Sequence, residues 1–207
     1  MTITSIEKTK KGRYSLFVDD EFLFSIHKDT FYKSKIKIGL NLSIQELEQL
    51  RYEDECFSAK NQALDILSRS AQSSGTLKDK LSRYYSAEPV DLAVLRMQEL
   101  GLVNDVDYAC RLARDCVNLR GYSLQRLKQH LRSKRLPTDA IDEALAQFEE
   151  HDETDPIVDI ILKKYRSKIF DRDGLQKTIA ALQRRGFRYE DIKSALRKIE
   201  DEELYDE

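Results

Sequence analysis

The chain has 207 residues, of which 41% are hydrophobic and 35% are charged, and its formal net charge is −2 at pH 7. This composition is that of a folded protein with a highly charged surface, and it excludes wholesale disorder. No apolar run approaches the roughly 20 residues needed to cross a bilayer, and the N-terminus lacks the features of a secretory signal. Seven Gly, three Pro and no Trp favour helices over a turn-rich β fold. We therefore expect a cytoplasmic, mostly helical protein with no membrane contact.

The first fifty residues contain most of the β-like sequence. Two short runs rich in aromatic and β-branched residues, 13–18 and 22–26, are separated by the acidic stretch 19–21. This pattern predicts a β-hairpin. We expect residues 3–8 to add a third strand across the turn at 10–12.

A helix is predicted to begin at the end of this segment. Ser43 is followed three residues later by Glu46, which is a capping-box signature. Three short strands bury too little apolar surface to be stable alone. We therefore expect the N-terminal segment, residues 1–54, to pack against the neighbouring helices.

The strongest regularity after residue 55 is a 51-residue period. Apolar residues recur at i, i+4 and i+7 in three places: Val90, Val94 and Met97; Ile141, Leu145 and Phe148; Ile192, Leu196 and Ile199. A second set occupies the segment before each of these: Leu77 and Leu81; Leu127 and Leu131; Thr178 and Leu182. A third set matches Val106, Ala109 and Cys110 with Ile157, Ile160 and Ile161. Three copies at a nearly fixed offset are typical of a repeat protein.

Each copy contains three amphipathic segments separated by turn residues. We predict helix N-caps at Thr76 and Ser123, and helix ends or turns at Gly101, Pro137 and Gly186. Units of this kind, joined end to end, contact mainly their neighbours. The predicted fold is mainly α: a tandem array of three three-helix repeats, residues 55–104, 105–154 and 155–207, in an elongated crescent that follows the small β-hairpin segment.

The sequence carries no enzyme signature. It has no GxxxxGK[ST] phosphate loop, no GxGxxG, no HExxH and no GxSxG. The three histidines are far apart, and we expect His130 to be a solvated position on a basic helix. The three cysteines are odd in number and lack CxxC spacing, which disfavours a disulfide scaffold or a zinc site. Cys110 aligns with Ile161, so we interpret Cys110 and Cys116 as core residues rather than nucleophiles. We expect no catalysis, cofactor or metal.

Positive charge is concentrated in the second and third repeats. Residues 111–135 carry eight Lys or Arg against one acidic residue, and residues 163–188 carry nine against two. Residues 139–155 carry eight Asp or Glu and no basic residue, and the acidic run 149–155 is the expected boundary between these repeats. An isolated surface charge is explained by the solubility of its helix alone. Two matching basic blocks instead favour a surface directed at a polyanion or an acidic protein.

Several stretches of the chain are similar to one known family. The junction 99–109 (ELGLVNDVDYA), followed by Arg111 and Arg114, and the stretch 121–127 (GYSLQRL) resemble the RecX family, bacterial regulators of the recombinase RecA. The likeness extends over nearly the whole chain, and the N-terminal segment resembles that of the longer, Gram-positive type members. One departure is Lys134-Arg135-Leu136, where the family has Lys-Gly-apolar.

The resemblance implies a regulator that binds RecA and the RecA–DNA filament. It implies inhibition of recombinase, ATPase and SOS co-protease activity, and we expect a monomer. The alternative from the residues themselves is a protein that binds DNA directly through its basic three-helix repeats, although the isoelectric point of about 6.0 argues against it.

The residues expected to face the partner are all basic: Arg111, Arg114, Arg120, Lys128, Arg132, Lys134, Arg135, Arg184, Arg185 and Arg188. Lys128, Arg132 and Arg135 would lie on one exposed stripe of a single helix if that helix persists. We expect charge reversal at the acidic Asp142, Glu143 and Glu149 to affect partner binding much less than reversal of the basic residues.

Overall fold

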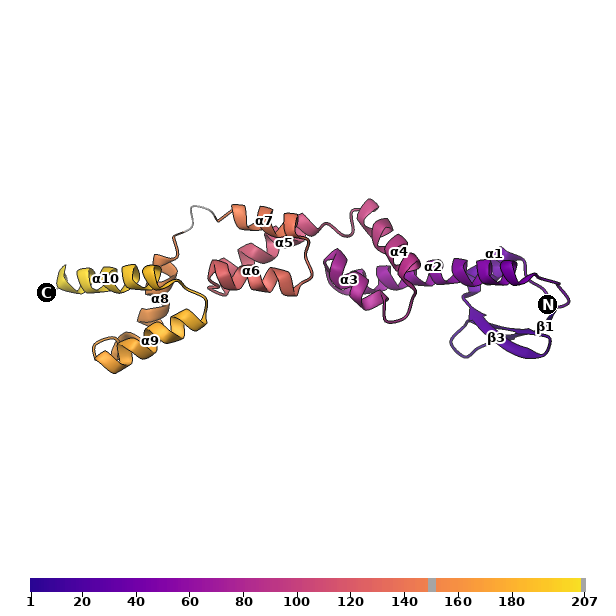
Figure 1. The fold of residues 1–207 in the computed structure, drawn as a ribbon, viewed down its shortest axis with the longest axis horizontal. Coiled ribbons are helices and arrows are strands. Elements are labelled where there is room, and N and C mark those ends of the chain that lie inside the picture. Colours follow the sequence, from indigo (N-terminus) through magenta and orange to yellow (C-terminus); the bar gives the residue numbers. More distant parts are fainter. Residues whose placement is uncertain (149–151, 206–207) are drawn as a thin grey trace. The chain divides into compact units, whose positions relative to one another are not determined.

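The computed structural model describes residues 1–148 and 152–205 (Figure 1). Within them the chain forms two units, Met1–Val103 and Asn104–Glu207. Residues 149–151 lie outside the described part, so the boundary expected at the acidic run falls partly outside it. The described part is mostly helical, with a single small sheet near the N-terminus. None of its helices is long and apolar enough to cross a membrane.

The first unit begins with a three-stranded antiparallel sheet of order β1-β2-β3. Its strands are β1 (Ile3–Lys8), β2 (Tyr14–Val18) and β3 (Glu21–Ile26). Asp19 and Asp20 have φ values of 50° and 68°, as a two-residue type I′ turn requires, and this turn matches the twist of the strands it joins. The predicted hairpin and third strand are confirmed.

The helix predicted from Ser43 and Glu46 is also confirmed. α1 (Lys28–Ser34) precedes it, and α2 spans Ile44–Arg69. The Ser43 N–H donates to the Glu46 carboxylate at 2.8 Å, and the Glu46 N–H donates to the Ser43 hydroxyl at 3.2 Å. The reciprocal bonds satisfy two amide groups that a helix start otherwise leaves without partners.

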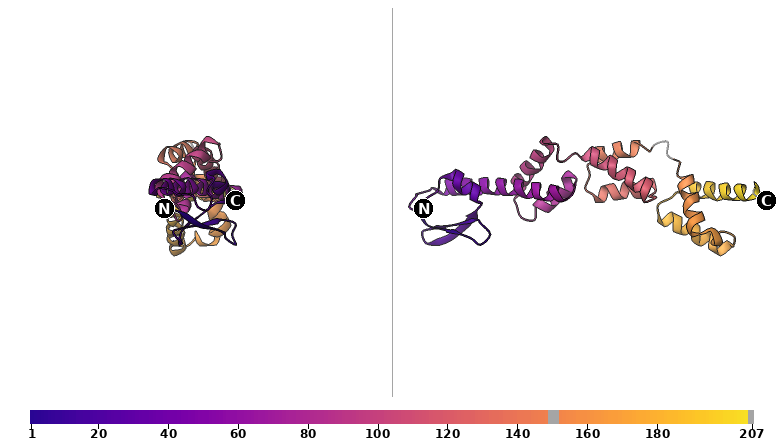
Figure 2. Two further views of the ribbon diagram at one scale, coloured as in Figure 1. Left: turned by 90° about the vertical axis from the view of Figure 1, so that its right-hand side faces the viewer. Right: turned by 180° about the vertical axis from the view of Figure 1, so that it is seen from behind.

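α2 belongs to two cores at once. Leu50, in its first half, is buried with residues of the sheet, whereas Ala59 and Ala63, in its second half, are buried in the first repeat. Figures 1 and 2 show the sheet near one end of α2 and α3 and α4 near the other. The helix therefore runs without a break through the position of the expected boundary between residues 54 and 55.

An ion pair with a buried carboxylate fastens the sheet to α2. Asp54 is 5% exposed, and its carboxylate accepts from the Arg13 guanidinium at 2.5 Å and from the backbone N–H of His27 at 2.6 Å. Arg13 also donates to the carbonyl of Ser25 at 2.7 Å. Removing Arg13 would leave the buried Asp54 carboxylate without its charged partner, which is destabilising, whereas the Arg13 side chain is itself 35% exposed.

The first repeat is completed by α3 (Ser74–Leu81) and α4 (Ala87–Glu99), and its core contains Leu77, Leu81 and Met97. The N-cap predicted at Thr76 is wrong. Ser73 is the cap, because its hydroxyl accepts from the N–H of Thr76 at 3.1 Å. Thr76 lies inside the first turn, where its own hydroxyl accepts from Ser73 at 2.9 Å.

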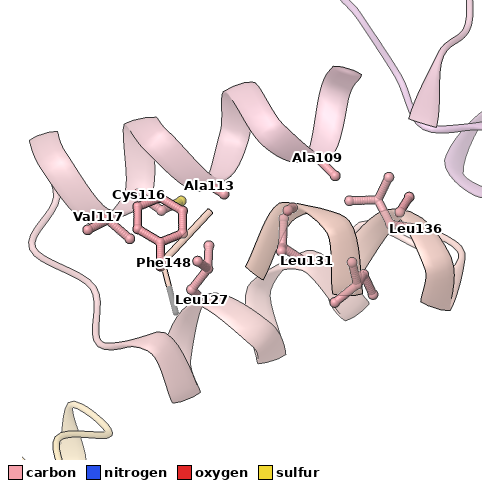
Figure 3. Packing of buried hydrophobic residues seen from close by; sticks show 11 residues of the cluster. Ala109, Ala113, Cys116, Val117, Leu127, Leu131, Leu136 and Phe148 are labelled. Atoms are coloured by element: carbon pink, nitrogen blue, oxygen red, sulfur yellow. The ribbon is translucent and has the colours of Figure 1, made fainter. Parts of the chain in front are cut away.

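The second repeat consists of α5 (Asp105–Arg114), a π-helical turn η1 (Asp115–Leu119), α6 (Leu124–Ser133) and α7 (Thr138–Ala146). Figure 3 shows its core, in which the labelled side chains of these helices point toward one another. The N-cap predicted at Ser123 is confirmed, with the Arg126 N–H donating to its hydroxyl at 3.2 Å.

The third repeat consists of α8 (Thr154–Lys164), a short 3₁₀ turn η2 (Arg166–Lys168), α9 (Arg172–Arg184) and α10 (Tyr189–Tyr205). Ile157, Ile161, Leu182, Ile192 and Ile199 form its buried core. The turn expected at Gly186 follows α9, with φ at 91°.

The 51-residue period holds for the third helices of all three repeats and for the second helices of the second and third repeats, whereas Leu77 and Leu127 are 50 apart. The first helices of the second and third repeats are offset by 52. Buried Ala109 matches buried Ile161, so Cys110 matches Leu162 rather than Ile161. Accordingly, Cys110 is half-buried and Leu162 is 38% exposed. The π-helical turn η1 explains the shift, because a π-bulge accommodates one extra residue.

One buried position of the third repeat holds a polar residue where the other two repeats have leucine. Thr178 stands where the other repeats have Leu77 and Leu127, it is 1% exposed, and its hydroxyl has no hydrogen-bond partner among the described residues. An unsatisfied buried hydroxyl destabilises a fold. We predict that Thr178→Val, which keeps the shape and removes the hydroxyl, raises the free energy of unfolding by about 1 kcal/mol, measured by urea denaturation.

The matched control is Thr138→Val at an exposed position in the first turn of α7. It should leave the free energy of unfolding unchanged or slightly lower. A Thr178→Val protein no more stable than the parent would show that its hydroxyl is satisfied in solution.

Candidate interaction surface

The ten basic residues expected to face a partner all lie in the second unit, and all are exposed or half-buried. The structure divides them into separate groups rather than one stripe. Two of these groups surround α6, whose sequence from Leu124 to Ser133 contains no acidic residue. α6 buries Leu127 and Leu131, which leaves the rest of its circumference for polar contacts.

The first group lies around a cavity of about 430 Å³ beside the end of α6. Lys128, Arg132 and Arg135 line it together with the apolar side chains of Leu136 and Ile141. These three basic residues lie together, as expected, but they do not share one stripe of a single helix. α6 ends at Ser133, so Arg135 reaches the cavity from the following turn.

Arg135 occupies this turn in a strained backbone conformation. Its φ is 54°, in the left-handed region that favours glycine. This is the position at which the sequence has Lys134-Arg135-Leu136 in place of Lys-Gly-apolar. The chain therefore carries a cation at the mouth of the cavity at the cost of backbone strain.

One acidic residue belongs to this cavity. Asp142 of α7 lines it with the three cations, so Asp142 is not a remote position and is not a suitable control for charge reversal. α7 packs against α6 in the same repeat, which brings its acidic face to the cavity edge. Glu143 does not line the cavity, and Glu149 lies outside the described residues.

The second group lies on the other side of α6, around Tyr122. The Arg126 guanidinium is 4.1 Å from the centre of the Tyr122 ring, and the His130 ring meets the same tyrosine edge-on at 5.7 Å. A stacked Arg–Tyr pair of this kind is a cation–π interaction. Lys134 is placed in this group because it does not line the first cavity and because its charge acts on His130.

His130 is half-buried rather than solvated, which corrects the expectation from sequence. Burial lowers the pKa of His130, and the charges of Lys134, Arg120 and Arg126 lower it further. The imidazole is therefore neutral at neutral pH, and the cluster takes its positive charge from Lys and Arg. The spacing of four residues from Tyr122 through Arg126 and His130 to Lys134 is the signal that could have identified this face.

The third group links the second and third repeats within the unit. Arg184 and Arg185 line a polar cavity of about 370 Å³ with Arg126, and the remaining lining residues are Gln125, Gln129, Gln183 and Gly186. Two hydrogen bonds join the start of α6 to the third repeat: the Ser123 hydroxyl donates to the Arg185 carbonyl at 2.9 Å, and the Leu124 N–H donates to the Glu153 carboxylate at 2.6 Å.

Five of the expected residues line neither cavity. Two of them, Arg120 and Lys134, act on His130 in the group around Tyr122, and the other three lie elsewhere. Arg111 is close to the Asp107 carboxylate at 3.7 Å and donates to the Asp107 carbonyl at 3.3 Å. Arg114 donates to the carbonyl of Cys110 at 3.3 Å. Arg188 is exposed in the turn before α10.

The cysteines provide no reactive centre in this surface. Cys116 is fully buried, and burial raises the pKa of its thiol, so the nucleophilic thiolate is disfavoured. Cys110 is half-buried and packs against the same core. Within the described residues, no group of three His, Cys, Asp or Glu side chains could hold a metal ion.

The strain at Arg135 gives a direct test. We predict that Arg135→Gly is more stable than Arg135→Ala by about 1 kcal/mol, because both variants lose the charge and only glycine tolerates a positive φ. Chemical denaturation of the two purified variants measures the difference. Equal stability would mean that the turn is not left-handed at this residue.

Comparison with known proteins gives the family. The models of the RecX N-terminal domain, the second three-helix domain and the third three-helix domain match residues 1–43, 104–145 and 153–196. Regulatory protein RecX of Clostridioides difficile (strain 630) is 32% identical, covering 99% of this chain and 98% of the relative. Regulatory protein RecX of Bacillus subtilis (strain 168) is 31% identical, covering 96% and 77%.

Solved structures support the same fold. A crystal structure of regulatory protein RecX aligns with a TM-score of 0.66 at 24% identity, covering 94% of this chain and 98% of that one. RecX from Lactobacillus salivarius aligns with a TM-score of 0.64 at 22% identity, covering 72% and 98%. The relatives are named as regulatory proteins and not as enzymes. With domain models that match both ends of the chain and relatives that span nearly all of it, this protein belongs to the RecX family of regulatory proteins.

Proposed function

We propose that this protein modulates the recombinase RecA by binding the RecA–DNA filament through the basic surface around α6, and that the result is inhibition. The observation that carries the proposal is the gathering of Lys128, Arg132 and Arg135 around one open cavity. Family membership supports the choice of partner. Action on a DNA-bound recombinase implies a cytoplasmic protein, and we propose that it acts as a monomer.

The energetics of such a surface favour a polyanionic partner. Exposed cations gain little from pairs within their own protein. Opposite a nucleoprotein filament they displace condensed counterions from the phosphates, and binding then weakens steeply as salt increases. Leu136 and Ile141 form an apolar part of the same cavity, so the site suits a surface that combines charge with apolar side chains.

The test is charge reversal at the first group. We predict that the triple variant Lys128→Glu, Arg132→Glu, Arg135→Glu binds RecA-coated single-stranded DNA about tenfold more weakly or worse, because three phosphate-facing cations become anions. Inhibition of the RecA ATPase should shift to higher protein concentration by a similar factor. Fluorescence anisotropy of labelled filaments and an ATPase titration measure the two effects.

A matched control is available in the third repeat. Lys177, Lys193 and Arg197 are exposed and line none of the cavities described above, and their reversal to Glu changes the net charge equally. This control should retain most of the binding and inhibition. If the triple variant at α6 is folded by circular dichroism and still inhibits RecA like the parent, the first group is not the interface.

A second candidate function is direct binding of nucleic acid. The observation that favours it is the polar cavity in which Arg126, Arg184 and Arg185 meet three glutamine side chains, because Arg contacts phosphate and Gln amides bond to base edges. Tyr122 beside Arg126 adds an aromatic ring at the edge of this group.

The two functions predict different preferences over a salt series. A filament regulator should bind RecA-coated DNA more tightly than naked single- or double-stranded DNA at every salt concentration. A direct DNA-binding protein should bind naked and coated DNA equally, and Gln125→Ala with Gln183→Ala should weaken it. Gel retention with both substrates separates these outcomes.

A further inference from the structure

A groove in the first unit has the opposite charge to the surface around α6. It has a volume of about 760 Å³ and lies between the segment after α1 and the first turns of α2. Its apolar lining and its acidic rim come from six residues: Ile36, Leu40, Leu42, Leu50, Glu46 and Glu53. A groove of this size is typical of ligand sites, in which an apolar floor provides affinity and a few polar groups provide orientation.

Both walls of the groove are held in place by backbone hydrogen bonds. On one side, the N–H of Gly39 donates to the carbonyl of Ile3 at 2.8 Å, and the N–H of Leu42 donates to the carbonyl of Met1 at 2.9 Å. These bonds fasten the segment to β1. On the other side, the Ser43–Glu46 capping box fixes the start of α2. The groove is therefore formed without a partner, which reduces the ordering cost of binding.

Large apolar side chains extend the surface on both walls. Ile38 is 62% exposed and Ile44 is 59% exposed, and they lie within the two segments that form the groove. Side chains of this kind next to a pocket with apolar lining mark an interaction site more often than an isolated exposed residue does.

The acidic residues on the rim of the groove favour a partner that carries positive charge. Glu46 and Glu53 line the groove and no basic residue does. Hydrogen bonds from the Ser43 backbone and hydroxyl lower the pKa of Glu46, which keeps this carboxylate ionised. Lys35 and Lys37 are on the wall segment but do not line the groove, and Arg51 of α2 lines a different cavity with Arg13.

We propose that this groove is a docking site for a segment of another protein that places one large apolar side chain beside a lysine or arginine. The apolar side chain would enter between Leu42 and Leu50, and the basic residue would pair with Glu53 at the rim. The proposal concerns a different unit and a different sign of charge from the surface around α6. It does not depend on the proposed function.

Selection from random 12-residue peptides displayed on phage, with the full chain as bait, tests this assignment. Enriched peptides should carry an aliphatic or aromatic residue next to Lys or Arg. A synthetic, labelled copy of an enriched peptide should lose about tenfold or more in affinity to Glu53→Arg. It should lose a similar factor to Gln45→Trp, which places a bulky ring in the groove.

The matched control is Glu48→Arg, on the same helix and exposed, but outside the groove lining. It should leave peptide affinity unchanged, as should reversal of Lys128, Arg132 and Arg135. Failure to enrich any peptide, enrichment of acidic peptides, or binding that ignores both groove variants would each overturn the proposal.

A second copy of this chain is the competing occupant. Analytical ultracentrifugation over a concentration series addresses it directly. A dimer that Glu53→Arg abolishes would assign the groove to self-association and overturn the proposal, whereas a monomer throughout supports a different partner.

Discussion

Each repeat depends on a close contact between its first and third helix, and in the first and second repeats small side chains allow that contact. In the second repeat α5 packs on α7, and Ala109, Ala113, Ala140 and Ala144 are all buried there. Because alanine adds little bulk between two backbones, the helices approach closely, and the middle helix closes the remaining side of the core. α2 packs on α4 in the same way through Ala59, Ala63 and Ala93, whereas α8 and α10 meet through larger side chains such as Ile161 and Ile192. The size of the alanines therefore sets how closely the helices pack in the first two repeats.

α6, the middle helix of the second repeat, contributes only a narrow stripe of side chains to the core. α6 gives two fully buried leucines to the core, so most of its surface can change without loss of packing. The two basic groups lie on opposite sides of this narrow buried stripe, one beside α7 and one beside Tyr122. Substitutions on the exposed surface of α6 can therefore change what this helix contacts without loss of the fold.

The sequence predicted those features that depend on periodicity and local chemistry. The hairpin and the capping box at Ser43 are present, and most of the repeat positions predicted from spacing are buried, although Leu145 and Leu196 are only partly buried. Features that depend on one residue of register were missed. The π-helical turn shifts α5 by a single position, which moved Cys110 off the buried face. The end of α6 at Ser133 placed Lys134 and Arg135 in different groups. Neither the π-bulge nor the exact end of α6 at Ser133 has a clear signature in the sequence.

Because α2 is one continuous helix, a tilt at one of its ends displaces the other end. A helix of 26 residues is about 39 Å long, and it is anchored at one end by the sheet and at the other by the first repeat. A tilt of roughly 10° at the repeat end would carry the far end of such a rod through about 7 Å. The Arg13–Asp54 pair ties the sheet to that rod, so the sheet and the groove beside it would move together. A displacement of the first repeat would thus move the groove, which lies several helical turns away along α2, without any direct contact between the two.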